Sequence, residues 1–511
     1  MNLKSIIFVI PIYKKMDANH EFTIERIKKE LLKQEKIKPN DKYIVLYRSI
    51  KNCILNTELS DNWLLPPTRV LAAALKVSRT TVLKAYELLQ LEKIILSKEG
   101  SGSRVSYSQI SENNKPEIQI VDSKEYPPIS KIGKSYLKNI KLINRLPNES
   151  IAFRPGLPPL DIFPIGQWKT LLNTYWQHVK SSGLSYSKAT RIIEKKKSIC
   201  DYLNISRNIK CKHEQLVIVS GSLQSLYLVA TTLINKGDEV VLENPVFPNI
   251  HSVFRSSKAK LIPLNLDDEG INIKELNQIK AQPKIICVTP SNHYPLGIKM
   301  SLNRRKELLD WASRNKALII ENDYENEISN VEYNIPTIFS LDKEDRTIYM
   351  GTFNRLLHPS IRLGYMIVPK YLVHAIEALQ EHSHRFVSPE VQMVMEQFIN
   401  KSYLYQHIKN CIKTARRRHD LFKDEFLKNC HSMYIQEKPF SSLHLVAFFK
   451  ENITAEHEKY VIDKLAENNI SAFALSKCYI TEPKKFGLIL GYSSVRSKVI
   501  SRKMKIMGKI L

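Results

Sequence analysis

The sequence lacks paired cysteines: seven cysteines are spread singly over 511 residues, and none forms a C-x-x-C pair. A scattered odd number argues against a disulfide framework and against a cysteine-based zinc site. It is typical of reduced thiols, which predicts a cytoplasmic protein. No spacing of histidines with carboxylates indicates a metal site either, so we expect no bound metal.

Long hydrophobic runs are also missing. The continuous apolar run near a terminus, "SIIFVIPI" at residues 5–12, is too short to span a bilayer and lacks a small-residue cleavage site. We therefore expect neither a membrane anchor nor a secretion signal. There is no internal repeat and no long low-complexity tract.

Acidic residues are scarce relative to basic ones. The chain has 77 Lys and Arg against 51 Asp and Glu, a formal net charge of +26. A surface this basic attracts polyanions, nucleic acid first and anionic membrane second, although a lysine-rich composition alone is weak support. Hydrophobic content of 43% is that of a folded protein, and the length favours two or three domains.

The composition and the hydrophobic pattern of the chain change along its length. We predict an N-terminal extension over residues 1–40, a small domain over 41–106, a polar linker with several prolines over 107–150 and a large domain over 151–511. The helix-like stretch "FTIERIKKELLKQEK" within the extension is interpreted as a support or a dimer contact.

Residues 64–105 combine two short amphipathic helices, a tight turn and a glycine hairpin. Pro67 and Thr68 begin the first helix, and Ser78 caps the second, whose apolar stripe includes Val82 and Leu89. Polar and basic residues at the start of a second helix are what a helix-turn-helix places in the major groove. The following "IILSKEGSGSRV" reads as a wing, although any helix pair with a hairpin would look similar.

This stretch, with "YIVLYRSIKNCIL" before it, resembles the winged helix-turn-helix of the GntR family of bacterial regulators. We expect DNA contacts from the recognition helix and its surroundings and from the wing. These residues are Arg69, Ser78, Arg79, Thr80, Thr81, Lys84, Lys98, Ser101, Gly102 and Arg104. The expected partner is double-stranded operator DNA.

From residue 151 onward, apolar strand-like runs alternate with helical patterns, as in "LVIVSG", "EVVLENP" and "ALIIENDY". This alternation predicts an α/β fold with a mostly parallel sheet covered by helices on both faces. Small and polar residues follow each run, and the carboxyl ends of parallel strands are where such folds place ligands. Ser222 begins a helix directly after Gly221, which forms a weak signal for a phosphate cradle.

The order of these segments, with "FRPGLPPLDIFPIGQW", resembles that of the MocR group. In this group a GntR-type winged helix-turn-helix domain, called the reader below, is fused to a fold-type I aminotransferase domain with a small C-terminal α+β subdomain. The resemblance implies pyridoxal phosphate (PLP), head-to-tail dimers and a ligand crevice. The implied cofactor-binding residues are Gly221, Ser222, Phe247, Asn292, Asn322, Tyr324, Asn354, Arg355 and Arg362.

Arg355 departs from the family pattern, because the Schiff-base lysine falls at this position and Asn354 replaces a serine. A guanidinium keeps its proton at accessible pH and cannot attack the PLP aldehyde, so covalent PLP is excluded at this position. A structural alternative for Arg355 is an ion pair with a carboxylate such as Asp323. Arg362 remains as a partner for an anion.

The ring-nitrogen aspartate of the family falls on Asn322, or on Asp323 if the match slides by one place. An asparagine cannot supply the charge that keeps the pyridinium protonated. The segment "LSYSKATRIIEKKKS" also lacks the group's glycines and its aspartate-proline pair.

The sequence therefore predicts a DNA-binding transcription regulator with no catalytic residues, whose aminotransferase-like domain serves for dimerisation. Effector sensing is a second role considered for this domain. Two alternatives remain open. One is a PLP-dependent aminotransferase; the other is a regulator that binds PLP or another small anion noncovalently.

Overall fold

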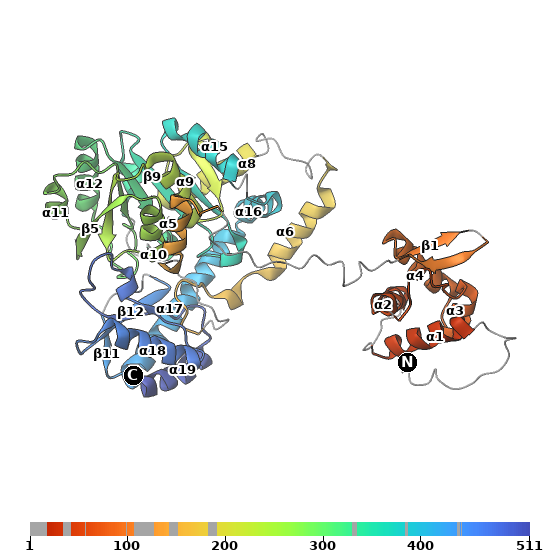
Figure 1. Ribbon diagram of the computed structural model, residues 1–511. Helices are drawn as coiled ribbons and strands as arrows, with labels where there is room; N and C mark the ends of the chain where they lie inside the picture. The colour runs from red at the N-terminus through yellow and green to blue at the C-terminus, as the bar shows by residue number, and fades with distance from the viewer. Residues whose placement is uncertain are drawn as a thin grey trace. The chain divides into compact units, whose positions relative to one another are not determined.

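A computed structural model describes residues 18–33, 42–56, 58–98, 100–106, 127–142, 152–181, 192–329, 335–383, 387–436, 440 and 442–511. The chain divides into two compact units, Met1–Pro127 and Pro128–Leu511 (Figure 1). Among the described residues, no helix has both the length and the apolar character needed to cross a bilayer. No cluster of three metal-ligating side chains occurs in that part of the chain.

The first unit is a helical domain with one hairpin. Its elements are α1 (Ala18–Leu32), α2 (Lys42–Leu55), α3 (Thr68–Leu75), α4 (Arg79–Leu91), β1 (Ile95–Lys98) and β2 (Gly102–Val105). The two strands pair antiparallel from Ile95 opposite Val105 to Lys98 opposite Gly102. This is the helix-turn-helix and wing that the sequence predicts.

Helix α1 is part of the same hydrophobic core. Ile24 and Ile27 are buried with residues of α2, α3 and α4, and Trp63 Nε1 donates to Thr23 Oγ1 at 2.9 Å. These contacts agree with the predicted role of this helix as a support for the domain.

The second unit contains a large sheet and a small one. The large sheet has the strand order β3-β10-β9-β8-β7-β4-β5-β6. Its strands are β3 (Leu216–Val219), β4 (Glu239–Asn244), β5 (Lys260–Asp267), β6 (Gly270–Ile271), β7 (Ile285–Val288), β8 (Leu318–Asn322), β9 (Thr347–Thr352) and β10 (Gly364–Ile367). Strands β5, β4, β7, β8 and β9 run parallel, whereas β10 is antiparallel to both β3 and β9. The predicted α/β fold with a mostly parallel sheet is confirmed.

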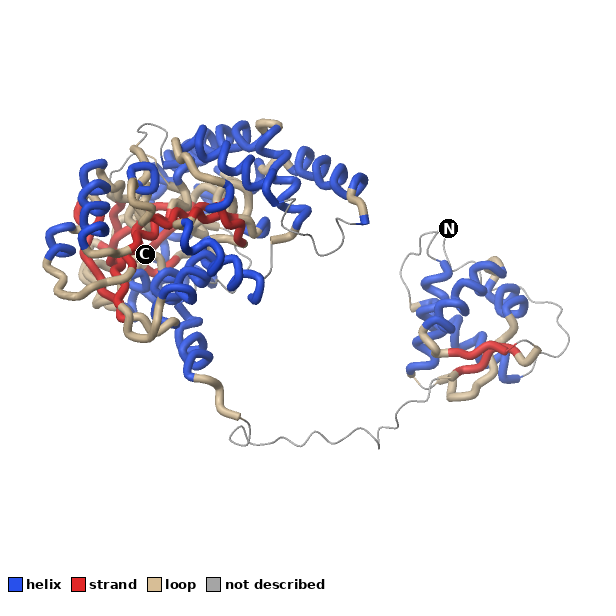
Figure 2. Tube along the Cα trace, turned by 90° about the horizontal axis from the view of Figure 1, so that it is seen from above, coloured by secondary structure: helices blue, strands red, loops and turns tan. Residues whose placement is uncertain are grey.

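Helices cover both faces of this sheet (Figures 1 and 2). Alternate strand residues enter separate cores: Ile218 and Tyr365 pack on one side, and Val219 and Met366 on the other. Burial on both faces explains why these strands read as continuous apolar runs. The covering helices and the short helices beside them are α6 (Ile165–His178), α8 (Ile192–Arg207), α9 (Ser222–Leu233), α10 (Pro248–Ser256), α11 (Ile273–Asn277), α12 (Leu302–Arg314), α13 (Asn326–Ser329), α14 (Ile338–Leu341), α15 (Val373–Ser383), α16 (Pro389–Asn400) and α17 (Tyr403–Asn429).

The C-terminal subdomain is α+β, as expected. Its antiparallel sheet has the order β11-β12-β14-β13, and its elements are β11 (Met433–Ile435), β12 (His444–Phe449), α18 (Ala455–Glu467), β13 (Phe473–Ala474), β14 (Gly487–Gly491) and α19 (Ser497–Ile510). Phe422 and Phe426 of α17 pack into the core of this subdomain, with Phe153 edge-on to Phe422.

Part of the segment expected as a linker is helical. Helix α5 (Lys131–Asn139) lies against α10 in the second unit (Figure 1). Ser252 Oγ of α10 donates to the Asn139 carbonyl at 3.2 Å, which fixes this contact.

Candidate functional site

The described part of the reader presents the expected DNA-binding residues around α4 and the wing. Ser78 caps α4, since its Oγ accepts from the Thr81 amide at 3.1 Å. Exposed side chains of this set are Arg69, Ser78, Arg79, Thr80, Lys84, Lys98, Ser101 and Arg104, with Gly102 also exposed and Thr81 half-buried. The start of α4 is therefore exposed to solvent.

Two of the basic side chains in this set have partners within the domain. Arg104 Nη1 donates to the Asn62 carbonyl at 3.1 Å, and the Lys84 ammonium lies 5.5 Å from the ring centroid of Tyr43. Arg79 is exposed in the first turn of α4.

A cavity of about 380 Å³ lies at the strand ends of the second unit. Most of the expected ligand-contacting residues line it, namely Gly221, Ser222, Phe247, Asn322, Tyr324, Asn354, Arg355 and Arg362. Further lining residues that the sequence did not single out include Arg154, Gly156, Thr352 and Phe473. The carboxyl ends of β8 and β9 and the turn after β3 bring these residues together.

The start of α9 forms one wall. Gly221 precedes the helix with φ of +132°, and a Cβ added there would lie 2.7 Å from Asn354 Nδ2. The Ser225 amide donates to the Gly221 carbonyl, which begins the helical ladder. The first amides of a helix have no partner within it, so this wall offers N–H donors and a positive dipole end to an anion.

Asn354 has a structural contact on either side. Its Oδ1 accepts from the Leu363 amide at 3.0 Å, and its Nδ2 donates to the Ser220 carbonyl at 3.4 Å. It thereby ties the loop after β9 to the end of β3.

The Arg355 guanidinium lies in the cavity beside Glu325, Tyr324 and Gly156. Nη1 lies 3.6 Å from Glu325 Oε1, and Cζ lies 5.3 Å from the ring centroid of Tyr324. A Cβ added to Gly156 would lie 1.5 Å from Arg355 Nη1, so a glycine is needed there. The ion-pair partner proposed from the sequence, Asp323, is wrong: the carboxylate is that of Glu325, two residues further on.

The Glu325 side chain is fully buried and accepts two hydrogen bonds. Its Oε2 accepts from Ser442 Oγ at 2.7 Å and from Asn292 Nδ2 at 3.2 Å. The structure therefore places Asn292 behind Glu325, outside the set of residues that line the cavity.

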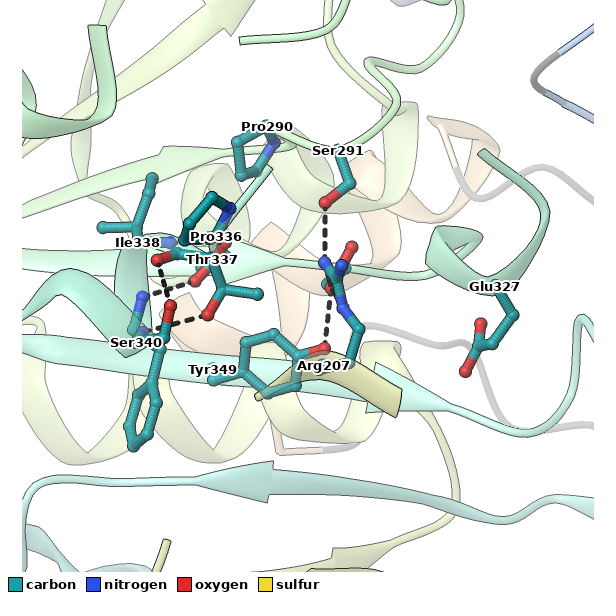
Figure 3. A network of polar contacts seen from close by, with 12 residues as sticks. Arg207, Pro290, Ser291, Glu327, Pro336, Thr337, Ile338, Ser340 and Tyr349 are labelled. Atoms are coloured by element: carbon teal, nitrogen blue, oxygen red, sulfur yellow. Dashed lines mark hydrogen bonds and ion pairs between the residues drawn. The ribbon is translucent and has the colours of Figure 1, made fainter. Parts of the chain in front are cut away.

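Asn322, the last residue of β8, faces the cavity, and Asp323 does not. Asp323 Oδ2 accepts from Arg207 Nε at 3.1 Å and from the Tyr349 hydroxyl at 2.7 Å, behind the cavity wall. Figure 3 shows Arg207 between Ser291 and Tyr349. Neighbouring residues of extended backbone point to opposite sides. Of the two residues that the sequence could not distinguish, Asn322 therefore lines the cavity and Asp323 does not.

Several buried polar atoms around the cavity have no hydrogen-bond partner in the described structure: Asn322 Oδ1, the hydroxyls of Tyr294 and Tyr324, and Arg355 Nη1. Burial raises the pKa of Tyr324 well above its usual value, with Glu325 adding to the effect, so this phenol stays neutral. Buried polar atoms in native proteins are normally bonded, so this cluster fits a polar ligand.

Comparison with known proteins agrees with both units. The sequence profile described as "Aminotransferase class I and II" matches residues 167–487. The chain belongs to the aminotransferase class I and II family. A second profile, "Bacterial regulatory proteins, gntR family", matches residues 42–105. The protein thus combines a GntR-type reader with an aminotransferase-family domain.

Relatives that match most of this chain are named as regulators. The probable rhizopine catabolism regulatory protein MocR of Rhizobium meliloti is 29% identical over 89% of this chain and 90% of its own length. The pyridoxine biosynthesis transcriptional regulator PdxR of Corynebacterium glutamicum is 23% identical over 84% of this chain and 87% of its own.

Solved structures share the fold of the second unit. The multiple substrate aminotransferase of Thermococcus profundus superposes with a TM-score of 0.65, at 21% identity, over 75% of this chain and 96% of its own. The kynurenine aminotransferase of Pyrococcus horikoshii gives 0.64 at 22% identity, over 78% and 98%.

This fold family binds PLP, and the cavity fits that group only in part. The start of α9 and Arg362 suit a phosphate, and Phe247 suits a ring. No lysine occurs among the described residues that line the cavity, and Arg355 cannot form a Schiff base. Asn322 also lacks the charge that would hold a protonated ring nitrogen.

Proposed function

We propose that this protein is a DNA-binding transcription regulator whose aminotransferase-family domain binds a small anionic ligand noncovalently and does not catalyse transamination. The observation that carries the proposal is Arg355, a permanently charged side chain at the Schiff-base position, ion-paired with buried Glu325. The reader, with Arg79 exposed at the start of α4, supports binding to operator DNA.

The ligand is expected to carry a phosphate or carboxylate. The start of α9 and Arg362 would hold the anion, and Asn322 would contact a polar ring atom as a neutral amide. Noncovalent PLP fits this description, as does another small phosphate or an amino acid.

Contacts of α5 support communication between the cavity and the reader. Helix α5 is the first helix described after the reader, and it touches both helices that begin at the cavity wall: Asn139 contacts α10, and Tyr136 lies 6.3 Å from Tyr227 of α9, centroid to centroid. A ligand that shifts the starts of α9 and α10 would therefore shift α5. Such a response requires unequal ligand affinity for the two states.

We also propose that the protein is a homodimer. We assign the contact to helix α6, because it exposes two large apolar side chains, Ile165 at 68% and Trp176 at 53%. Sedimentation should give a dimer mass, and Trp176→Glu should lower it toward a monomer. A monomeric wild-type protein would overturn this part of the proposal.

The function is tested by adding PLP to the purified full-length protein, then borohydride, in parallel with operator selection. We expect a selected operator, no trapped pyridoxyl adduct and no amino-donor turnover. A panel of vitamers and amino acids then measures ligand-dependent operator affinity. Unchanged affinity across the panel would leave the domain as a dimerisation scaffold, and an adduct with turnover would establish an enzyme.

Tyr136→Ala tests the communication step. It should leave operator affinity without ligand unchanged and abolish the ligand-dependent change. Tyr460→Ala, an exposed tyrosine on α18, serves as the control. A full ligand response in Tyr136→Ala would exclude this contact as the route.

A further inference from the structure

Cys200 and Cys211 lie together although eleven positions separate them in the sequence. Cys200 is on α8, and Cys211 is in the segment between α8 and β3. The helix ends at Arg207, and Asn208 follows with φ of +52° and donates its amide to the Asn204 carbonyl at 3.1 Å. This left-handed helix end turns the chain back along α8, which brings Cys211 beside Cys200.

The two sulfur atoms are 3.2 Å apart, about 1 Å more than the length of a disulfide bond. Both thiols are free, Cys200 is buried, and Cys211 is half-buried at the surface of the cluster. The other five cysteines are all buried in the described structure. Cys211 is therefore the sulfur that a small oxidant or a second thiol can approach.

The neighbourhood favours a reactive sulfur on Cys200. The Cys211 thiol donates to Cys200 Sγ, which lowers the pKa of Cys200. Lys196 acts in the same direction, whereas burial and the nearby carboxylates of Asp201 and Glu214 oppose it. The same contact and burial raise the pKa of Cys211, so Cys200 is the thiol that ionises first. A thiolate is the form of cysteine that attacks peroxides and disulfides.

We propose that Cys200 and Cys211 form a reversible intramolecular disulfide when the protein meets a peroxide. In the first step one thiolate attacks a peroxide oxygen and becomes a sulfenic acid, while the O–O bond breaks and the other oxygen leaves as water after taking a proton. In the second step the other thiol gives up its proton and its sulfur attacks the sulfenic sulfur, which forms the S–S bond and breaks the S–O bond. The displaced hydroxide takes that proton and leaves as a second water. Two thiols are oxidised and one hydrogen peroxide is reduced to two waters.

The bridge would close a short loop that contains Arg207. This arginine supports Asp323, next to cavity-lining Asn322, and Tyr202 on the same helix donates to Glu327 Oε1 at 2.6 Å. A disulfide would therefore fix the end of α8 behind the cavity. The proposal does not depend on the identity of the ligand or on DNA binding.

The test treats the full-length protein with a small excess of hydrogen peroxide and blocks free thiols by alkylation in denaturant without reductant. Trypsin then cuts after Lys197, Arg207, Lys210 and Lys212. We expect peptide 198–207 joined to peptide 211–212, with the loss of two hydrogen atoms, and two of the seven cysteines protected from alkylation. Dithiothreitol should separate the peptides and restore both thiols.

Cys200→Ser and Cys211→Ser should each abolish the linked peptide, whereas Cys53→Ser in the reader should leave it at the wild-type yield. The wild-type peptide map alone decides the question if a variant fails to fold. All seven thiols still alkylated after peroxide, or oxidation to sulfinic acid without the linked peptide, would overturn the proposal.

Discussion

The guanidinium of Arg355 lies 3.6 Å from the buried carboxylate of Glu325, with the ring of Tyr324 beside it. Ser442 and Asn292 both donate to the other oxygen of the same carboxylate, Glu325 Oε2. Arg355, which we propose occupies the Schiff-base position, is therefore part of an ion pair whose carboxylate is buried. Replacing it by a lysine alone would place a primary amine in the same cavity.

We predict that Arg355→Lys gains a PLP adduct that the wild-type protein lacks. A lysine amine can lose its proton and attack an aldehyde, whereas a guanidinium cannot. After PLP and borohydride, peptide mass spectrometry should find a pyridoxyl group at position 355 of the variant. Arg362→Lys is the control and should remain unlabelled at position 362. Equal labelling of the wild-type cavity would contradict the proposed noncovalent site.

Arg79→Ala should weaken operator binding by about 1–3 kcal/mol and flatten its salt dependence, because one cationic contact is lost. Fluorescence anisotropy over a salt series measures both quantities. Lys459→Ala, on the surface of α18, is the control in the other unit and should bind like the wild type. Unaltered binding by Arg79→Ala would refute α4 as the recognition helix.

Arg207→Met should lower the free energy of unfolding by about 3–5 kcal/mol, because it leaves Asp323 as an unpaired buried charge. Tyr349 alone would still donate to that carboxylate. Chemical denaturation followed by circular dichroism measures the change. Removing an exposed pair with Lys459→Ala should have little effect. A wild-type denaturation midpoint for Arg207→Met would show that the pair is not needed for stability.

Glu243 should make the protein less stable as the pH rises from about 4.5 to 7. Burial raises the pKa of this carboxyl from 4.5 to about 7, against the opposing hydrogen bonds from Thr289. Between these values the folded protein holds a proton that the unfolded chain has lost, so the free energy of unfolding falls with pH and levels off above pH 7.

Glu243→Gln cannot titrate, so its stability should fall less steeply over that range in thermal melts at several pH values. Asp463→Asn on the exposed face of α18 is the control and should keep the wild-type slope. An unchanged slope in Glu243→Gln would show that this carboxyl is already ionised in the folded protein.

Periodicity and turn chemistry predicted part of the secondary structure, although helix α5 lies in the segment predicted as a linker. The apolar runs that end at Val219, Asn322 and Thr352 became β3, β8 and β9, because strands buried on both faces need no polar alternation. Ser78 before a stripe of Val82 and Leu89 located the start of α4, since capping is a local property. The antiparallel β10 could not be distinguished, because its run is as apolar as those of the parallel strands.

The sequence by itself determined the chemistry at position 355, because a guanidinium cannot serve as an amine nucleophile in any surroundings. It could not determine which carboxylate neutralises that charge, nor which of Asn322 and Asp323 faces a ligand. Those answers depended on the direction in which each side chain leaves β8 and on Gly156, which lies far from Arg355 in the chain and gives its guanidinium room. Such relationships are set only when distant segments pack together, and no local pattern encodes them.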